Sequence, residues 1–309
     1  MLSRIGVHTS VDVLFPPSVL RDALSDVEPT VEIVETAADL DECDALVTFS
    51  YDESFLDADL DWIHSIQSGV DRFPFDRLER RGIALTSSTG IHGDSVGETV
   101  VGYMLQFARR LHVHRDNERR REWQFPPWDA PFTLPGESLC VVGLGTLGQG
   151  IARRADALGV DVVGVKRTPT PVEHISRVYT PGELQEAIAD VRFVAVAVPL
   201  TDRTEGSIGA DEFGVMREDA YLLNVSRGGV VDDSALLDAL RDDELAGAAL
   251  DVFETEPLPD RSEFWERENV IVTPHAAAAN REYYRRVGAL VRENVRRLDA
   301  NETLANHVV

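Results

Sequence analysis

The glycine-rich segment at 143–148, Gly-Leu-Gly-Thr-Leu-Gly, constrains the fold of this chain more than any other feature. It follows an apolar run at 139–142 and leads into an amphipathic stretch from Ile151, so the pattern predicts strand, tight turn and helix. The first glycine permits the turn, the second lets a pyrophosphate approach, and the third lets helix pack on strand. The helix N-terminus then presents free N–H groups to an anion. Glycines that serve only the turn are the alternative interpretation.

Five more strand-like runs follow this segment, at 160–165, 193–198, 221–225, 248–253 and 270–273. Together with the run at 139–142 they make six strands. Six strands that alternate with helices fit a doubly wound parallel sheet of the kind that binds dinucleotides. Similar runs alternate with amphipathic stretches in the first ninety residues, at 5–8, 31–34, 45–49, 62–67 and 83–87. They predict a second parallel sheet with crossover helices.

Two helices are expected to join the two regions. Apolar residues keep to one stripe over 96–111, with Asp94 and Ser95 as the N-cap, and the proline-rich stretch at 123–136 then reads as a connector. The last helix, over 284–298, has no strand of its own to cover, so we expect it to pack on the N-terminal region. The chain then crosses twice between domains, near 100 and 283, with a cleft between them.

The end of the second strand bears on cofactor choice. Lys166, the only lysine of the chain, stands there with Arg167 and Thr168, eighteen positions past Gly148. A site for NAD normally has Asp or Glu about 20 residues past the glycines, to hold the ribose hydroxyl. Two cations and a hydroxyl instead suit a 2′-phosphate, so NADP(H) is favoured, with use of NAD(H) left open. Solvated loop residues are the alternative interpretation.

The net charge limits the possible partners. The chain has 54 acidic and 30 basic residues, a formal charge of −24. Nucleic acid and anionic membranes both need a basic surface, so we exclude them as main partners. We interpret the acidity as halophilic, because molar salt screens the repulsion; an acidic protein of an ordinary cytoplasm is the alternative. Two cysteines and no apolar run of 18 residues predict a cytoplasmic protein, and we expect no metal site.

Three further motifs end strands of the second sheet. Arg227 lies in Asn-Val-Ser-Arg-Gly-Gly, where its guanidinium suits a keto-acid carboxylate. Glu256 lies in Leu-Asp-Val-Phe-Glu-Thr-Glu-Pro, and His275 in Thr-Pro-His-Ala-Ala. A histidine beside a carboxylate can give a proton to a carbonyl oxygen as hydride arrives. Taken one at a time, Arg227 reads equally well as an ion-pair residue and His275 as a structural residue.

The glycine-rich segment, Ser226-Arg227-Gly228, residues 251–257 and Pro274-His275 occur in the order and approximate spacing of the D-isomer-specific 2-hydroxyacid dehydrogenases, which the chain resembles over nearly its whole length. The resemblance implies an α/β protein with a Rossmann doubly wound cofactor domain at 101–282. A smaller flavodoxin-like substrate domain takes up 1–100 and 283–309. Family members are commonly dimers built around the cofactor domains, so a homodimer is expected.

The resemblance also implies roles for individual residues. The catalytic set is Arg227, Glu256 and His275, and substrate contacts come from Arg227, His275 and the loop Ser68, Gly69 and Val70. His92 lies near the cleft by resemblance, where contact with substrate and stabilisation of its loop are both open. The implied cofactor contacts are Gly143, Gly145, Thr146, Leu147, Gly148, Lys166, Arg167, Thr168, Val198, Pro199, Thr204, Val225, Ser226, Asp251 and His275, with Asp251 at the nicotinamide carboxamide.

Two departures from the family pattern bear on substrate and cofactor. Gly97 and Thr99 stand where the family more often has Ala and His or Tyr, and Lys166 replaces the usual acidic residue. Formate dehydrogenases share the fold but have Gln at the position of Glu256. The sequence thus predicts reversible hydride transfer between NADP(H) and a 2-keto acid, giving a D-2-hydroxy acid. A narrower glyoxylate/hydroxypyruvate reductase, or a dinucleotide-sensing scaffold like the corepressors of this fold, are the alternatives.

Overall fold

The computed structural model describes residues 2–309 and divides into two compact units. Unit 1 contains residues 2–91 and 279–309, and unit 2 contains His92–Ala278. The sequence places the two crossings near 100 and 283; in the structure the chain leaves unit 1 before α4 begins and returns before α10.

Unit 1 is built on a five-stranded parallel sheet with the order β2-β1-β3-β4-β5. Its strands are β1 (Arg4–His8), β2 (Thr30–Val34), β3 (Ala45–Thr48), β4 (Trp62–Ser65) and β5 (Ala84–Ser87). Its helices are α1 (Pro17–Ala23), α2 (Ala37–Leu40), α3 (Phe75–Arg81) and α10 (Tyr283–Asp299), with 3-10 helices at Thr9–Val13 and Glu53–Leu56. This strand order is that of flavodoxin-like sheets.

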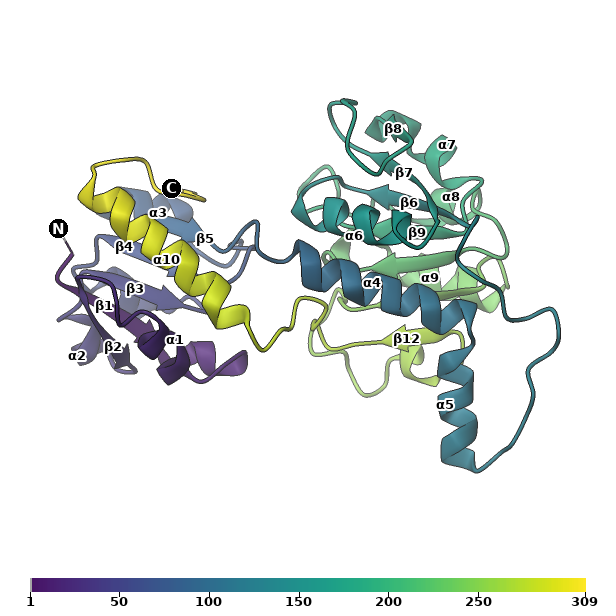
Figure 1. The fold of residues 1–309 in the computed structure, drawn as a ribbon, viewed down its shortest axis with the longest axis horizontal. Coiled ribbons are helices and arrows are strands. Elements are labelled where there is room, and N and C mark those ends of the chain that lie inside the picture. Colours follow the sequence, from purple (N-terminus) through teal and green to yellow (C-terminus); the bar gives the residue numbers. More distant parts are fainter. Residues whose placement is uncertain (1) are drawn as a thin grey trace. The chain divides into compact units, whose positions relative to one another are not determined.

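Side chains alternate across the sheet of unit 1, so that each strand feeds two cores. Ala45 and Val47 pack with α1 and α10, whereas Leu46 packs with α2 and α3. Figure 1 shows α10, the yellow helix, lying over the same face as α1. The expected return of the last helix to the N-terminal region is thereby confirmed.

Unit 2 is built on a seven-stranded parallel sheet with the order β12-β11-β10-β9-β6-β7-β8. Its strands are β6 (Ser138–Val142), β7 (Asp161–Val165), β8 (Arg177–Tyr179), β9 (Phe193–Val196), β10 (Tyr221–Asn224), β11 (Gly247–Leu250) and β12 (Val270–Val272). Its helices are α4 (Gly93–Ala108), α5 (Leu111–Arg120), α6 (Thr146–Asp156), α7 (Leu184–Ile188), α8 (Ala210–Phe213) and α9 (Asp233–Arg241), with 3-10 helices at Pro181–Glu183, Gly228–Val230 and Glu263–Glu266. Apart from an added seventh strand, this is the order of a Rossmann sheet.

Both faces of this sheet are covered. Leu139 and Val141 face α4 and α6, and Cys140 and Val142 face the core that α7, α8 and α9 close. Strands buried on two faces read as continuous apolar runs, which is why the sequence predicts them well. The exception is β8, whose three residues Arg-Val-Tyr are too few and too polar to stand out.

The long helix differs from the expectation at both ends. It begins at Gly93, before the expected cap, and Asp94 accepts a hydrogen bond from Arg154 Nη2 (3.0 Å) on α6 instead of capping α4. It ends at Ala108 because Arg110 takes a left-handed conformation (φ 56°), after which α5 starts in a new direction. In Figure 1, α5 projects from the body of unit 2 and the proline-rich connector returns to unit 2 in a wide loop.

Candidate active site

The strand order of unit 2 brings the sequence motifs to one edge of the sheet. All seven strands run parallel, so the segments after β6, β7, β9, β10, β11 and β12 leave the same, carboxyl-terminal edge. The direction of winding reverses between β6 and β9, and open α/β sheets bind ligands at such a switch point. The glycine-rich segment follows β6 directly and therefore stands at that point.

Each glycine of this segment has its own steric reason. Gly143 has φ 101°, and a Cβ there would lie 2.6 Å from the carbonyl oxygen of Ala197. A Cβ on Gly148 would lie 1.9 Å from the carbonyl oxygen of Gly143, whereas one on Gly145 would meet nothing within 4 Å. Helix α6 starts at Thr146 and Leu147 without a side-chain cap on its first N–H groups. The open space at Gly145 and these N–H groups suit a pyrophosphate.

Lys166, Arg167 and Thr168 follow β7, beside the glycine-rich segment. The N–H of Gly143 donates to the carbonyl oxygen of Val165 (3.0 Å), so the two segments start together at the sheet edge. Lys166 Nζ donates to Thr170 Oγ1 (3.2 Å), and Arg167 and Thr168 are exposed. The two cations are therefore available to a phosphate in this loop.

The segment after β9 forms a closed turn. Thr204 Oγ1 donates to the carbonyl oxygen of Pro199 (2.6 Å) and accepts from the N–H of Thr201 (2.9 Å). Val198 stands against the first glycine, because its Cγ1 would lie 2.7 Å from a Cβ on Gly143. The three residues expected at the cofactor, Val198, Pro199 and Thr204, thus border the switch point.

The loop that carries Arg227 is held by the side chain of Asn224, for which the sequence motif predicts no role. Asn224 Oδ1 accepts from the N–H (3.1 Å) and Oγ (2.9 Å) of the buried Ser226, and its Nδ2 donates to the carbonyl oxygen of Arg227 (3.2 Å). Arg227 Nη1 donates to the carbonyl oxygen of Ser226 (2.8 Å). Val225, between them, is buried in the face toward α4 and α6.

The Arg227 loop and the Glu256 loop are in backbone contact. A Cβ on Gly228 would lie 1.8 Å from the carbonyl carbon of Phe253, so this position excludes a side chain. Glu256 Oε1 accepts from the N–H of Phe253 (3.1 Å), which ties the carboxylate to the same stretch of backbone. The two loops therefore form one packed unit that follows β10 and β11.

His275 pairs with Glu256: Nδ1 of the ring and Oε2 of the carboxylate are 2.8 Å apart. Burial raises the pKa of Glu256, but the hydrogen bonds from His275 and the Phe253 N–H, together with the charge of Arg227, outweigh it and set the pKa below its ordinary value. The carboxylate is thus ionised near neutral pH, where its hydrogen bond orients the imidazole ring. The expected catalytic set of Arg227, Glu256 and His275 lies on three neighbouring loops.

The backbone at His275 is left-handed, with φ 51°, which is uncommon for a residue with a side chain. Asp251, 2% exposed at the end of β11, holds this loop. Its carboxylate accepts from the N–H groups of Ala276 and Ala277 (both 2.8 Å) and from Thr273 Oγ1 (2.6 Å), and its carbonyl oxygen accepts from the N–H of His275 (2.8 Å). A contact between Asp251 and the nicotinamide carboxamide stays a prediction.

The expected substrate loop lies in unit 1, directly after β4. The N–H of Ser88 donates to the carbonyl oxygen of Gln67 (2.9 Å), and Ser68 Oγ donates to the carbonyl oxygen of Ser88 (3.5 Å). Gly69 and Val70 continue the loop, and His92 is buried at the start of unit 2. The contribution of Ser68, Gly69, Val70 and His92 to substrate binding stays a prediction.

Two hydroxyl side chains that no sequence motif marks form hydrogen bonds to the His275 loop. Thr99 Oγ1 donates to the carbonyl oxygen of Ala277 (3.0 Å), and the hydroxyl of Tyr103 is 2.5 Å from Thr273 Oγ1. Their spacing of four on the expected helix was the available signal. Within residues 2–309, no group of three or more His, Cys, Asp or Glu is arranged to hold a metal, and no helix has the length and apolarity of a membrane span.

Comparison with known proteins identifies the family. Residues 101–277 match the model of the D-isomer specific 2-hydroxyacid dehydrogenase, NAD binding domain. A glyoxylate reductase of Thermococcus litoralis is 31% identical over 277 residues, which cover 86% of this chain and 83% of that protein. A D-3-phosphoglycerate dehydrogenase of Methanocaldococcus jannaschii is 33% identical over 242 residues, 78% of this chain but only 46% of that longer protein.

A solved structure agrees in fold over both units. The NADPH-dependent glyoxylate/hydroxypyruvate reductase of Sinorhizobium meliloti, in complex with NADP and sulfate, has a TM-score of 0.82 at 26% identity and covers 99% of this chain and 98% of its own. The two parallel sheets of this chain thus belong to a known two-domain fold. The chain is an oxidoreductase that belongs to the D-isomer specific 2-hydroxyacid dehydrogenase family.

Proposed function

We propose that this protein reduces 2-keto acids to D-2-hydroxy acids with NADPH, and that His275 is the acid that supplies the proton. The observation that carries the proposal is the His275–Glu256 pair (2.8 Å), held on a loop next to the one that carries Arg227. NADPH, when bound, supplies the hydride. The overall balance is keto acid, NADPH and one proton giving hydroxy acid and NADP⁺.

The geometry supports one atom of His275, Nε2, as the proton donor. Because Nδ1 of His275 is engaged by Glu256, the other ring nitrogen, Nε2, gives its proton to the keto oxygen as the carbonyl carbon is reduced. Glu256 stabilises the imidazolium before transfer and keeps the ring oriented during it. In the reverse direction, neutral His275 takes the proton from the alcohol.

Arg227 is proposed to bind the substrate carboxylate with two parallel hydrogen bonds and to polarise the carbonyl group. The backbone N–H groups of Ser68, Gly69 and Val70 are proposed to bind the substrate carboxylate as well. The relatives from Thermococcus litoralis and Sinorhizobium meliloti are a glyoxylate reductase and a glyoxylate/hydroxypyruvate reductase, and both names indicate small substrates. We therefore infer a preference for glyoxylate and hydroxypyruvate over longer keto acids.

The test is turnover. NADPH oxidation is followed at its absorbance band in molar KCl with glyoxylate, hydroxypyruvate, pyruvate and longer 2-keto acids, and the products of hydroxypyruvate and pyruvate are separated by chirality. Reduction to the D-isomer supports the proposal, and formation of the L-isomer contradicts the stereochemistry. NADPH binding without turnover on any of these acids would favour the sensing scaffold instead.

The preference for NADPH rests on Lys166, Arg167 and Thr168, which follow β7 at the edge where the glycine-rich segment begins. The substitution Lys166→Asp should lower kcat/KM with NADPH and raise it with NADH, about 10-fold or more in the ratio, because charge-assisted hydrogen bonds contribute about 1.5–3 kcal/mol. Arg80→Asp, the same change of charge on α3 of unit 1, is the control and should leave the ratio unchanged. An unchanged ratio in Lys166→Asp would remove the basis of the preference.

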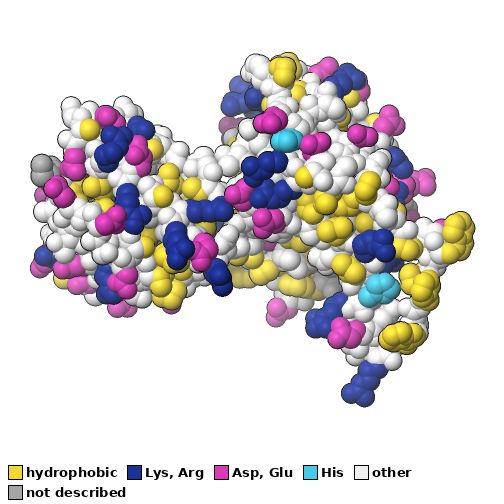
Figure 2. Space-filling model, viewed as in Figure 1, with side chains coloured by type: hydrophobic (Ala, Val, Ile, Leu, Met, Phe, Trp, Pro, Cys, Tyr) yellow, Lys and Arg dark blue, Asp and Glu magenta, His cyan; other side chains and the backbone are white. Residues whose placement is uncertain are grey.

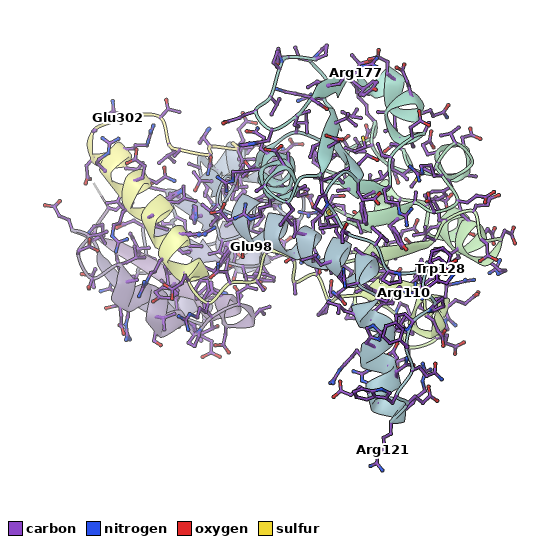
Figure 3. The ribbon with its side chains drawn as sticks, turned by 45° about the vertical axis from the view of Figure 1, so that its right-hand side comes forward. Glu98, Arg110, Arg121, Trp128, Arg177 and Glu302 are labelled. Carbon is purple, nitrogen blue, oxygen red and sulfur yellow. The ribbon has the colours of Figure 1, made fainter. Side chains whose placement is uncertain are left out.

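We also propose a homodimer formed through the arm, defined as residues 109–128, which contains α5. Three aromatic side chains of the arm are almost fully exposed: Trp123 (103%), Phe125 (94%) and Trp128 (90%). Figure 2 shows hydrophobic side chains gathered on the arm, and Figure 3 labels Trp128, Arg110 where α5 begins and Arg121 at its outer end. Exposed aromatic groups of this kind are typical of interfaces.

The charge of the arm indicates what it binds. It holds six arginines and three acidic residues in a chain of net charge −24. A second copy of this acidic chain is therefore a complementary partner for the arm. The triple variant Trp123→Ser, Phe125→Ser, Trp128→Ser should sediment as a monomer where the wild type sediments as a dimer. Val13→Ser, which removes an exposed apolar side chain (70%) from unit 1, is the control, and a wild-type monomer would refute the proposal.

Two proposals concern the setting in which the protein works. Both cysteines, Cys43 and Cys140, are buried and free, which supports a reducing compartment such as the cytoplasm. The charge of −24 and the single lysine support a protein adapted to molar salt. The dependence of the melting temperature on KCl concentration tests this adaptation.

A further inference from the structure

Helix α4 presents two hydroxyl groups to the loop that carries His275. Thr99 and Tyr103 are four positions apart and so lie on the same face of the helix, one turn from each other. Thr99 Oγ1 donates to the carbonyl oxygen of Ala277 (3.0 Å), and the Tyr103 hydroxyl contacts Thr273 Oγ1 (2.5 Å). The two contacts lie on either side of His275 in the sequence.

The direction of the hydrogen bonds from Tyr103 onward is determined by proton count. Thr273 has one hydroxyl proton and donates it to Asp251 Oδ1 (2.6 Å), because a carboxylate only accepts. The short contact with Tyr103 therefore has the tyrosine as donor. Burial raises the pKa of Tyr103 to about 12, so the phenol keeps this proton over the whole neutral range. Tyr103, Thr273 and Asp251 thus form one directed chain.

Asp251 passes this chain on to the backbone around His275. Its carboxylate accepts from the N–H groups of Ala276 and Ala277, and its carbonyl oxygen accepts from the N–H of His275. A left-handed residue with a side chain persists only where its surroundings hold it. The contacts from α4 belong to those surroundings, together with those from Asp251 and Glu256.

The same helix also contacts the start of the dinucleotide-binding helix. A Cβ on Gly97 would lie 2.4 Å from the carbonyl oxygen of Gly150 on α6, so α4 and α6 touch through their backbones. Helix α4 therefore joins the glycine-rich segment to the His275 loop. A displacement of α4 would move one relative to the other.

We propose that Thr99 and Tyr103 are positioning residues for the reaction, which fix the His275 loop from α4 so that the proton donor stands in register with the substrate carbonyl group. This rests on the proposed role of His275. Neither residue belongs to the proposed substrate or cofactor contacts. Both therefore act on the proton-transfer step and not on NADPH affinity.

The test uses variants that remove one oxygen or keep it. Tyr103→Phe and Thr99→Val delete the hydroxyl groups, Thr99→Ser keeps one, and Tyr284→Phe on α10 is the matched control for loss of a phenol oxygen. We expect kcat to fall about 10- to 100-fold in each deletion, since a misplacement of about 1 Å can cost roughly 100-fold in rate. NADPH affinity should stay within about twofold, and Thr99→Ser should recover most of the rate.

Two further measurements separate positioning from a merely structural role. The solvent deuterium isotope effect on kcat should rise in Tyr103→Phe and Thr99→Val, because proton transfer becomes more rate-limiting. Amide hydrogen exchange of the 273–278 peptide should accelerate while the rest of unit 2 stays protected. A lower rate with an unchanged isotope effect, or faster exchange with unchanged kcat, would overturn the proposal.

Failure of the proposed function gives a different result. If the wild type reduces no keto acid, the function is refuted, and exchange in the 273–278 peptide still decides whether α4 fixes the loop. Unchanged exchange in both deletion variants refutes the positioning role, whatever the turnover of the wild type.

Discussion

Replacing Gly148 or Gly145 of the glycine-rich segment with alanine should impair two different properties of the protein. In Gly148→Ala the new methyl group would lie 1.9 Å from the carbonyl oxygen of Gly143, whereas in Gly145→Ala it would meet nothing within 4 Å. Gly145 has φ −78° and ψ −160°, which alanine adopts without strain. We expect Gly148→Ala to lose stability and Gly145→Ala to lose cofactor binding.

The magnitude for Gly148→Ala follows from the contact. The obstructing atom belongs to the backbone, so no side-chain rotation relieves it and α6 must move by about 1 Å or more. Overpacking of this kind costs about 3 kcal/mol or more, and the better helix propensity of alanine returns about 1 kcal/mol. A net loss of about 2–3 kcal/mol lowers the melting temperature by roughly 4–12 °C for a domain of this size.

For Gly145→Ala the loss is in binding. The methyl group occupies the space proposed for the pyrophosphate, and losing charge-assisted hydrogen bonds worth about 1.5–3 kcal/mol weakens NADPH about 10- to 100-fold. Thermal unfolding followed by circular dichroism, and NADPH titration followed by nucleotide fluorescence, both in molar KCl, give the two quantities. If Gly148→Ala is as stable as the wild type, or Gly145→Ala binds NADPH normally, the steric argument for this segment is wrong.

Three other predictions concern stability. Burial raises the pKa of Asp233 from 3.8 to about 6, and the charges of Glu254 and Asp232 add to this shift. Between these two pH values the folded state holds a proton that the unfolded state releases. The free energy of unfolding therefore falls as the pH rises from about 4 to about 6. Asp233→Asn should therefore raise the melting temperature at neutral pH and leave it unchanged below about pH 4; an equal shift at both would contradict this. Gly97→Ala places a methyl group against the backbone of α6 and should lower the melting temperature. Gly102→Ala on the same helix has nothing within 4 Å of its Cβ and should raise the melting temperature slightly. Equal effects of the two substitutions would contradict the close contact between α4 and α6. Raising KCl from low to molar concentration should raise the melting temperature of the wild type steeply, and a flat dependence would refute the adaptation to salt.

Much of the architecture could be predicted because most strands of both sheets are buried and apolar on two faces. The runs near Val141 and Val194 stand out in the sequence for that reason, and the glycine-rich segment fixes which strand is central. The short strand β8 was not predicted, because three residues are too few to show a pattern of alternating hydrophobicity. The early start of α4 escaped because Asp94 looks like a cap in the sequence but bonds to Arg154 across helices, a contact that no local pattern shows.

The candidate site divides in the same way. Arg227, Glu256 and His275 stand at strand ends inside recognisable motifs, so the sequence was enough to name them. Thr99 and Tyr103 reach the His275 loop from a helix more than a hundred residues away in the chain, and only the packing of α4 on unit 2 shows it. Thr99 drew notice only as a departure from the family pattern, and its hydrogen bond to Ala277 gives that departure a structural meaning.

The most direct test of the account is the rate of a single turnover. Wild type and His275→Ala, both saturated with NADPH, are mixed with excess glyoxylate, and NADPH absorbance is followed by stopped flow; His307→Ala, an exposed histidine of unit 1, is the control. If His275 supplies the proton, the rate in His275→Ala should be about 10²–10⁴-fold lower with NADPH affinity unchanged, as loss of a general acid requires. A rate equal to that of the wild type would contradict it.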